Sequence, residues 1–124
     1  MTTNIRVIRA HDFVRATADG QIEFEKSKKL LREVAEASAT LVDYEIILDT
    51  RKAEGELSVT NLWYLAAELS DLGKAFHRKT AVLCPLERFD SAEFFELCAR
   101  NRGFRVRAFT SYEEAMEWLM SREA

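Results

Sequence analysis

The chain has few of the residues that mark disulfide-rich or metal-binding proteins. Its 124 residues include two cysteines, two histidines, four glycines and one proline. Cys84 and Cys98 both lie in apolar runs, where a reduced thiol packs as a small hydrophobic group. We therefore expect both to be core residues. A metal site that also uses His11 and His77 is disfavoured, because the four residues are scattered along the chain.

Long apolar runs are missing as well. Residues 1–6 lack the apolar region of a secretory signal, and no apolar run approaches the length of a membrane span. The composition, 48% apolar and 31% charged, is typical of a folded globular protein. Since no linker, repeat or low-complexity segment interrupts residues 1–124, we expect one cytoplasmic domain without a membrane span.

The usual signatures of catalysis and cofactor binding do not occur. The chain has no glycine-rich phosphate loop, no nucleophile elbow, no paired histidines on a helix and no Cys-x-x-Cys motif. The net charge of −3 gives no general attraction to nucleic acid, and the basic segment 74–107 lacks interleaved exposed aromatics. We therefore expect no enzyme activity, catalytic residue, cofactor, metal or nucleic-acid partner.

The chain does contain a regular alternation of apolar strands and amphipathic helices. Two strands are predicted between residues 4 and 17, followed by a turn at Asp19 and Gly20. Further strands are predicted at 41–49, 81–84 and 104–108, the last at or near an edge of the sheet. A first helix is predicted at 23–38. The N-caps of the later helices are predicted at Ser58, Asp90 and Ser111, and Gly73 and Gly103 are predicted to end the first two of these.

The order of these elements, β-β-α-β-α-β-α-β-α, predicts the fold class. Strands that alternate with helices form a mainly parallel sheet covered by helices. We expect a single-domain α/β fold with a mixed, mainly parallel sheet of five strands and about four helices. The unbroken apolar run 46–48 predicts burial on both faces, so the strand 41–49 is expected to be central.

The candidate site follows this central strand, in the polar tract 49–60 that opens the next helix. In open α/β sheets, binding sites lie at such junctions. We interpret Asp49 as a carboxylate at the end of the strand that accepts main-chain hydrogen bonds from the next segment. The hydroxyls of Ser58 and Thr60 are expected near the unpaired N–H groups of the helix N-terminus, where a phosphate would be tolerated. Ser58 and Thr60 are thus the predicted phospho-acceptors, although Ser58 as a helix cap alone also explains the pattern.

Two aromatic residues fall outside the inner stripe of the same helix. Trp63 and Tyr64 are expected to face outward near Ser58, which indicates a protein contact. The predicted binding surface therefore comprises Asp49, Arg51, Trp63 and Tyr64.

The chain resembles the STAS and SpoIIAA-like domains. The resemblance rests on the order of elements, on the strand 44–49 that leads to a Ser-capped helix, and on the ending with Phe109 and the segment 114–119, Glu-Ala-Met-Glu-Trp-Leu. It implies a SpoIIAA-like fold and, as in the anti-sigma-factor antagonists, a serine at the start of the second helix that a kinase partner phosphorylates. Ser58 is the matching position, although those regulators carry an Asp-Ser-Ser-Gly-like stretch and this chain has Leu-Ser-Val-Thr at 57–60.

Three hypotheses follow from these observations. The leading one is a non-enzymatic regulatory domain that binds a protein, either a kinase or an anti-sigma-like regulator, and that is switched by phosphorylation at Ser58 or Thr60; a homodimer is also compatible with the sequence. The alternative is a domain that binds a small apolar or anionic ligand, such as a lipid or nucleotide, at the same loop. A third is a hydrolase or transferase that uses Asp49, Arg51 and Ser58.

Overall fold

The computed structural model describes residues 3–8 and 13–121 of the chain. These residues form a five-stranded sheet with the strand order β1-β2-β3-β4-β5 and four α-helices. The strands are β1 (Thr3–Ile8), β2 (Phe13–Gln21), β3 (Glu45–Glu54), β4 (Thr80–Leu83) and β5 (Val106–Phe109). The helices are α1 (Phe24–Ser38), α2 (Val59–Asp71), α3 (Phe89–Asn101) and α4 (Tyr112–Met120), with short 3-10 helices η1 (Ala75–His77) and η2 (Leu86–Arg88).

The sheet is mixed. β2, β3, β4 and β5 run parallel to one another, whereas β1 pairs antiparallel with β2. The predicted α/β class, the order of the elements and the number of helices are confirmed. The parallel part of the sheet comprises four strands, because β1 turns back directly onto β2 without a helical crossover.

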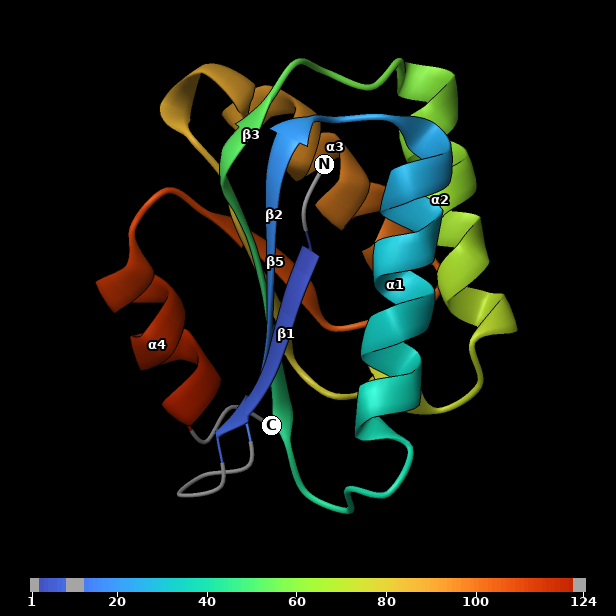
Figure 1. Cartoon of the computed structure of the whole chain (residues 1–124), viewed down its shortest axis with the longest axis vertical. Coiled ribbons are helices and arrows are strands. Elements are labelled where there is room, and N and C mark those ends of the chain that lie inside the picture. Colours follow the sequence, from blue (N-terminus) through green and yellow to red (C-terminus); the bar gives the residue numbers. More distant parts are fainter. Residues whose placement is uncertain (1–2, 9–12, 122–124) are drawn as a thin grey trace.

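The helices cover the two faces of the sheet unequally. Figure 1 shows α1, α2 and α3 on one face and α4 alone on the other. Alternate residues of β3 point to opposite faces, so Leu48 packs in the core under α1, α2 and α3, and Ile47 packs in the smaller core under α4. β3 is therefore buried on both faces, as its apolar run predicts, and lies at the centre of the sheet.

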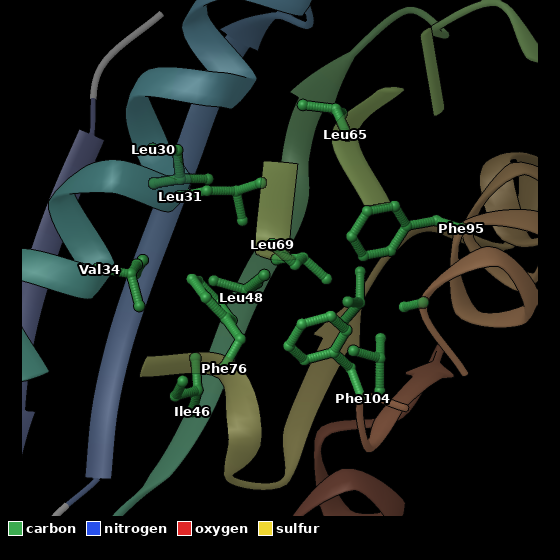
Figure 2. Close-up of a cluster of buried hydrophobic side chains, with 14 of the residues drawn as sticks. Leu30, Leu31, Val34, Ile46, Leu48, Leu65, Leu69, Phe76, Phe95 and Phe104 are labelled. Carbon is green, nitrogen blue, oxygen red and sulfur yellow. The ribbon is translucent and has the colours of Figure 1, made fainter. Parts of the chain in front are cut away.

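The larger core brings together side chains from all three helices and the sheet. In Figure 2, Leu30 and Leu31 extend from α1, and Phe95 extends from α3, towards the middle of the sheet. Phe76, from η1, is fully buried among them. Each buried side chain of this size stabilises the fold by about 1.5–3 kcal/mol relative to an exposed one, so this core holds the three helices in place.

Several predicted helix ends are confirmed. The Ser58 side chain caps α2 by accepting a hydrogen bond from the main-chain N–H of Asn61 at 3.1 Å. Gly73, just after α2, has a φ of +71°, the left-handed conformation that glycine adopts without strain. Ser111 caps α4 in the same way as Ser58 caps α2, by accepting from the N–H of Glu114 at 3.3 Å.

Two boundary predictions around the candidate site are wrong. Asp19 and Gly20 do not form a turn but continue β2, where they pair with Lys52 and Ala53 of β3. Consequently β3 extends to Glu54, five residues beyond the predicted end. Thr17 pairs with Asp49 and Asp19 pairs with Lys52, so β3 carries one additional residue at a β-bulge. The bulge lies between the end of the predicted strand at Thr17 and the predicted turn residues Asp19 and Gly20, and β2 and β3 remain paired on both sides of it.

The start of α3 also differs from its prediction. The helix begins at Phe89, its N-cap is Arg88 without a side-chain cap bond, and Asp90 lies in the first turn. The 3-10 turn η2, which follows Pro85, feeds directly into the helix and replaces the expected cap. His11 lies outside the described residues.

No helix in the described part of the chain is both long enough and apolar enough to cross a bilayer.

Candidate functional site

The candidate site lies along the rim at the carboxyl ends of the parallel strands. Because β2, β3 and β4 are each followed by a helix that returns across the same face, α1, α2 and α3 all begin at this rim. Each of these helix N-termini carries unpaired N–H groups and the positive end of the helix dipole. Three helix dipoles therefore direct their positive ends to this rim, where acidic side chains also lie in the first turns of α1 and α3.

The predicted phospho-acceptors lie at the start of α2. Ser58, the N-cap, and Thr60, in the first turn, are both exposed. The hydroxyl oxygen of Ser58 accepts one hydrogen bond from Asn61, so the side chain is held at the helix terminus while it remains open to solvent. A phosphoryl group attached there would lie next to the N-terminal N–H groups of α2.

The predicted aromatic residues form an exposed group on the outer face of α2. Trp63 is 47% exposed and Tyr64 is 53% exposed, and their rings meet edge to face with 5.2 Å between centroids. Val59, one turn before Trp63, is 64% exposed. The guanidinium of Arg102, at the end of α3, lies 5.0 Å from the centroid of the Trp63 ring. We name Val59, Trp63 and Tyr64 the α2 patch.

Asp49 is a buried carboxylate held by two arginines. Its oxygens accept hydrogen bonds from Arg51 Nε at 3.0 Å and Nη2 at 2.9 Å, and from Arg15 Nη2 at 3.0 Å. As predicted, it also accepts a main-chain bond, from the N–H of Arg51 at 3.1 Å. Burial raises the pKa of Asp49, but the bonds from Arg51 and Arg15 outweigh that effect, so its pKa lies below the ordinary value. Asp49 is therefore an ionised anchor for two guanidinium groups.

Asp49 and Arg51 do not share a surface with the aromatic residues. They continue the face of β3 that carries Ile47, which packs under α4. The guanidinium groups of Arg51 and Arg15 both lie within 6 Å of the ring of Tyr112, the first residue of α4. The structure thus places Asp49 and Arg51 on the α4 side of the sheet, and the α2 patch on the other side.

Arg88 lies on the same side of the sheet as α2 and holds the end of β3. β4 pairs with β3 only as far as Asp49, so the following residues of β3 have no strand on that side. Arg88, which is 7% exposed, donates from Nη1 to the main-chain oxygen of Ala53 at 2.7 Å and from Nη2 to the main-chain oxygen of Thr50. Nη2 also donates to the Thr50 hydroxyl at 3.1 Å. The guanidinium thereby donates hydrogen bonds to main-chain oxygens of β3 that no neighbouring strand pairs with on that side.

A largely apolar cavity of about 110 Å³ lies beside Arg88, between the sheet and the starts of α1, α2 and α3. Its inner wall includes Leu48, Val82 and Phe95, which belong to the larger core. Half-buried residues of the rim, among them Leu57 and Ser91, form its outer wall. The polar groups along the wall come from β3, the residue after β4, η2, α1 and α3: Thr50, Cys84, Arg88, Ser27 and Ser91.

Sequence reasoning expected a ligand pocket between the segment after Asp49 and the start of the helix at Ser58, but it did not identify Arg15, Arg88 or the residues that line the cavity. Arg15 alternates with Val14 and Ala16 in a strand, a pattern that could have assigned it to a polar face but not to Asp49. No sequence pattern indicated the contact of Arg88 with β3, because this contact depends on where the pairing between β4 and β3 ends. Within the described residues, no group of three or more His, Cys, Asp or Glu side chains could hold a metal ion.

Comparison with known proteins assigns the fold. An uncharacterized protein of the DUF3478 family with a SpoIIAA-like fold, from Shewanella loihica PV-4, matches with a TM-score of 0.62 and 16% identity over 95% of this chain and 92% of that chain. An anti-sigma factor antagonist from Mycobacterium paratuberculosis matches with a TM-score of 0.60 and 17% identity over 97% and 94%. The fold is therefore SpoIIAA-like, as the sequence resemblance implied. No protein-family model matches the chain, and no curated protein sequence matches it.

Proposed function

We propose that this domain is a non-enzymatic, cytoplasmic regulatory domain that binds a protein partner through the α2 patch. The single observation that carries the proposal is the exposure of Val59, Trp63 and Tyr64 next to an exposed, helix-capping serine. Its fold is shared with an anti-sigma factor antagonist, which supports a regulatory role.

The chemistry of the α2 patch suits a protein interface. Tyr and Trp supply large contact areas with few rotatable bonds, and they are enriched at the energetic centres of interfaces. The edge-to-face contact of the two rings, together with Arg102 against Trp63, orders the side chains before any partner binds. Pre-ordered side chains lose less entropy on binding. Asp49 and Arg51 take no part in this surface, because they lie on the opposite side of the sheet.

Phosphorylation of Ser58 or Thr60 by a kinase would switch this interface. A phosphoryl group adds about −1.5 to −2 charges at neutral pH, beside a patch that otherwise has an apolar and aromatic surface. Two acids, Glu54 and Glu56, already precede α2. An acidic partner would be repelled by the modified domain, whereas a partner with an arginine cluster would be attracted to it.

The test compares capture of partners from a lysate of the source organism by the wild-type protein and by variants. Tyr64→Ala and Trp63→Ala should each lower the yield of the same partner by about tenfold or more. Val42→Ala is the matched control, since Val42 is 90% exposed and precedes β3, at the opposite end of the strands. If Tyr64→Ala and Trp63→Ala capture every protein as well as Val42→Ala does, the α2 patch is not the interface.

The effect of charge at Ser58 needs a separate pair of variants. Asp and Asn both cap a helix well, but only Asp adds a negative charge. Ser58→Asp should change partner capture, and Ser58→Asn should not. Sedimentation of the same variants at several concentrations would show whether the partner is a second copy of this chain. Equal capture by the Asp and Asn variants would contradict the charge switch.

A second candidate function, the binding of a small ligand at the same rim, is favoured by the apolar cavity beneath the start of α2. Native mass spectrometry of freshly purified protein should then show retained mass. A spectrum of bare protein from several expression hosts would count against this function and would leave the protein-binding proposal untouched.

A further inference from the structure

The residues that line the cavity determine which kind of ligand it can bind. Most of the lining is aliphatic or aromatic, from Leu30, Leu31, Leu62 and Phe95 among others, so the body of a ligand must be apolar. An apolar cavity of about 150 Å³ admits a six-carbon ring. The volume here is about 110 Å³, so the body is limited to about four to six carbon atoms.

Arg88 places a positive charge in this apolar wall. Glu87 and Glu56 are near enough to attract Arg88, but no carboxylate of the described residues forms an ion pair with it, whereas Arg15 and Arg51 both pair with Asp49. The guanidinium stays protonated, because arginine is not deprotonated in proteins. A buried cation without a directly paired carboxylate is costly, and an anion bound against it would offset that cost.

The hydrogen-bonding capacity of Arg88 is not exhausted. A guanidinium has five N–H donors, and the acceptors of Arg88 among the described residues are Thr50 and Ala53, reached from Nη1 and Nη2. Its Nε–H has no acceptor there. The Thr50 hydroxyl donates to the main-chain oxygen of Leu83 at 2.7 Å, so it is already oriented. Donors thus remain for an anion that enters from the cavity.

The surrounding helices favour the same sign of charge. α1, α2 and α3 begin around the cavity, and the first turns of α1 and α3 contribute Ser27 and Ser91 to its wall. The positive ends of these helix dipoles add to the charge of Arg88. A neutral ligand would gain less from either contribution, because hydrogen bonds between a guanidinium and an anion are stronger than those to a neutral acceptor.

We propose that this cavity binds a small amphipathic monoanion, a carboxylate with an apolar body of about four to six carbons, with the carboxylate against Arg88 and the body between Leu48 and Phe95. This inference rests on the second candidate function, small-ligand binding, and adds the chemical class of the ligand. It requires neither a partner protein nor modification of Ser58.

The probes are hexanoate, hexanamide and hexylammonium, titrated into ¹⁵N-labelled protein at constant ionic strength and followed by the amide spectra. The three molecules share one apolar tail and differ in the charge of the head group. Hexanoate should shift the amides of Thr50, Cys84 and Ala92 saturably, and should bind about tenfold or more tightly than hexanamide. Hexylammonium should bind most weakly.

Two variants separate the charge from the volume. Arg88→Met should reduce the affinity for hexanoate to that for hexanamide, with Arg105→Met, an exposed arginine before β5, as the matched control. Because Arg88→Met also removes the bonds to Thr50 and Ala53, Ala92→Leu is the second variant: it keeps Arg88 and fills the cavity. Ala92→Leu should abolish binding of both hexanoate and hexanamide without lowering the thermal midpoint, since filling a cavity does not expose apolar surface.

Each outcome has a defined meaning. If hexanoate and hexanamide bind equally, and Ala92→Leu abolishes both, the cavity is a ligand site but the anionic class is wrong. If none of the probes binds the wild-type protein, the inference is overturned, and native mass spectrometry of the purified protein decides the small-ligand function separately. If hexanoate binds but Ala92→Leu leaves its affinity unchanged, the anion lies elsewhere and the inference is wrong.

Discussion

At the scale of single residues, Asp49 shows how one carboxylate can organise a whole corner of the sheet. Its two oxygens receive both guanidinium groups and a main-chain N–H, and the arginines then extend to the ring of Tyr112. The arrangement fixes the bulged segment of β3 against the start of α4. Most of its stabilisation depends on Asp49 being charged, since hydrogen bonds to charged groups are stronger than those between neutral groups.

Asp49→Asn should destabilise the protein at neutral pH by about 2 kcal/mol, because the arginines lose their counter-ion and are themselves about a third exposed. The folded-state pKa of Asp49 is depressed, so this stabilisation is present above the unfolded value near 3.8 and is lost as the pH falls through the folded-state pKa. Urea unfolding at neutral and acidic pH measures the effect, and the difference between wild type and variant should shrink below pH 3.8. Asp43→Asn is the control: Asp43 pairs with Arg78 but is exposed, and its replacement should cost less than about 0.5 kcal/mol. A difference that persists unchanged into acid would contradict the assignment.

The two cysteines should differ in reactivity. Burial raises the pKa of the Cys84 thiol to about 11, and its Sγ lies 3.6 Å from the main-chain oxygen of Phe109. Cys98 is half-buried, and burial raises its pKa as well. Since the thiolate is the reactive form, alkylation at neutral pH should label Cys98 first and Cys84 far more slowly. Mass spectrometry of time points, with Cys98→Ser to isolate Cys84, checks this order, and equal rates would refute it.

At the scale of elements, α4 is held at both of its ends by different devices. Ser111 caps its N-terminus, and Lys79, a buried residue just before β4, closes its C-terminus. The Nζ of Lys79 donates to the main-chain oxygens of Trp118 at 2.9 Å and Ser121 at 2.7 Å, and to the Ser121 hydroxyl at 3.0 Å. The Trp118 oxygen also accepts from the N–H and the hydroxyl of Ser121, so the ammonium adds to an existing C-terminal cap and opposes the negative end of the helix dipole.

Lys79→Met should therefore destabilise the protein by about 2 kcal/mol and loosen α4 selectively, because the chain length is kept and the donors are lost. Thermal unfolding measures the first effect, and hydrogen exchange of the amides of α4 measures the second. The matched substitution Lys74→Met removes an exposed lysine and should leave both unchanged. If α4 exchanges no faster in Lys79→Met than in the wild type, Lys79 does not hold the helix.

The ends of α2 and α4 could be predicted from the sequence because their signals are local. A serine that caps its own helix, as Ser58 does, and a glycine in a left-handed turn, as Gly73, interact within a few residues. The end of β3 could not be predicted, because Lys52 and Glu54 are poor strand formers that are held by pairing with Asp19 and Gln21. Strand partners that are more than thirty residues apart in the chain cannot be recognised from a local sequence pattern.

The candidate site divides in the same way. Exposure of Trp63 and Tyr64 followed from helical periodicity, which is local. Asp49 is separated from them because alternate residues of β3 face opposite sides of the sheet, and α4 covers the side that Asp49 faces. Arg88 is important because β4 pairs with β3 only as far as Asp49. Sequence reasoning thus located the rim but not which residues of the rim share a face.

At the scale of the whole molecule, the two sides of the sheet differ in how firmly they are held. Among the described residues, twenty-three buried side chains form the core under α1, α2 and α3, and eight form the core under α4. The central strands β3 and β4 belong to both cores. Local opening requires little free energy where few apolar contacts are lost.

Hydrogen exchange of the wild-type protein should therefore rank its elements. Amides of β3 and β4 should exchange most slowly, at the free energy of global unfolding, and amides of α4 should exchange before those of α1 and α3. Mass spectrometry of peptic fragments over time measures this order. Protection of α4 equal to that of β3 would mean that the molecule opens only as one unit.

The hydrogen bonds from Arg88 to β3 also have a use in protein engineering. Arg88 binds main-chain oxygens of Thr50 and Ala53, which every amino acid supplies, while Lys52 and Glu54 direct exposed side chains away from this contact. This anchoring uses the hydroxyl of Thr50 but no side chain at positions 52 and 54. Libraries randomised at these two positions should yield folded clones at high frequency, which makes this strand a graft point for new recognition sequences.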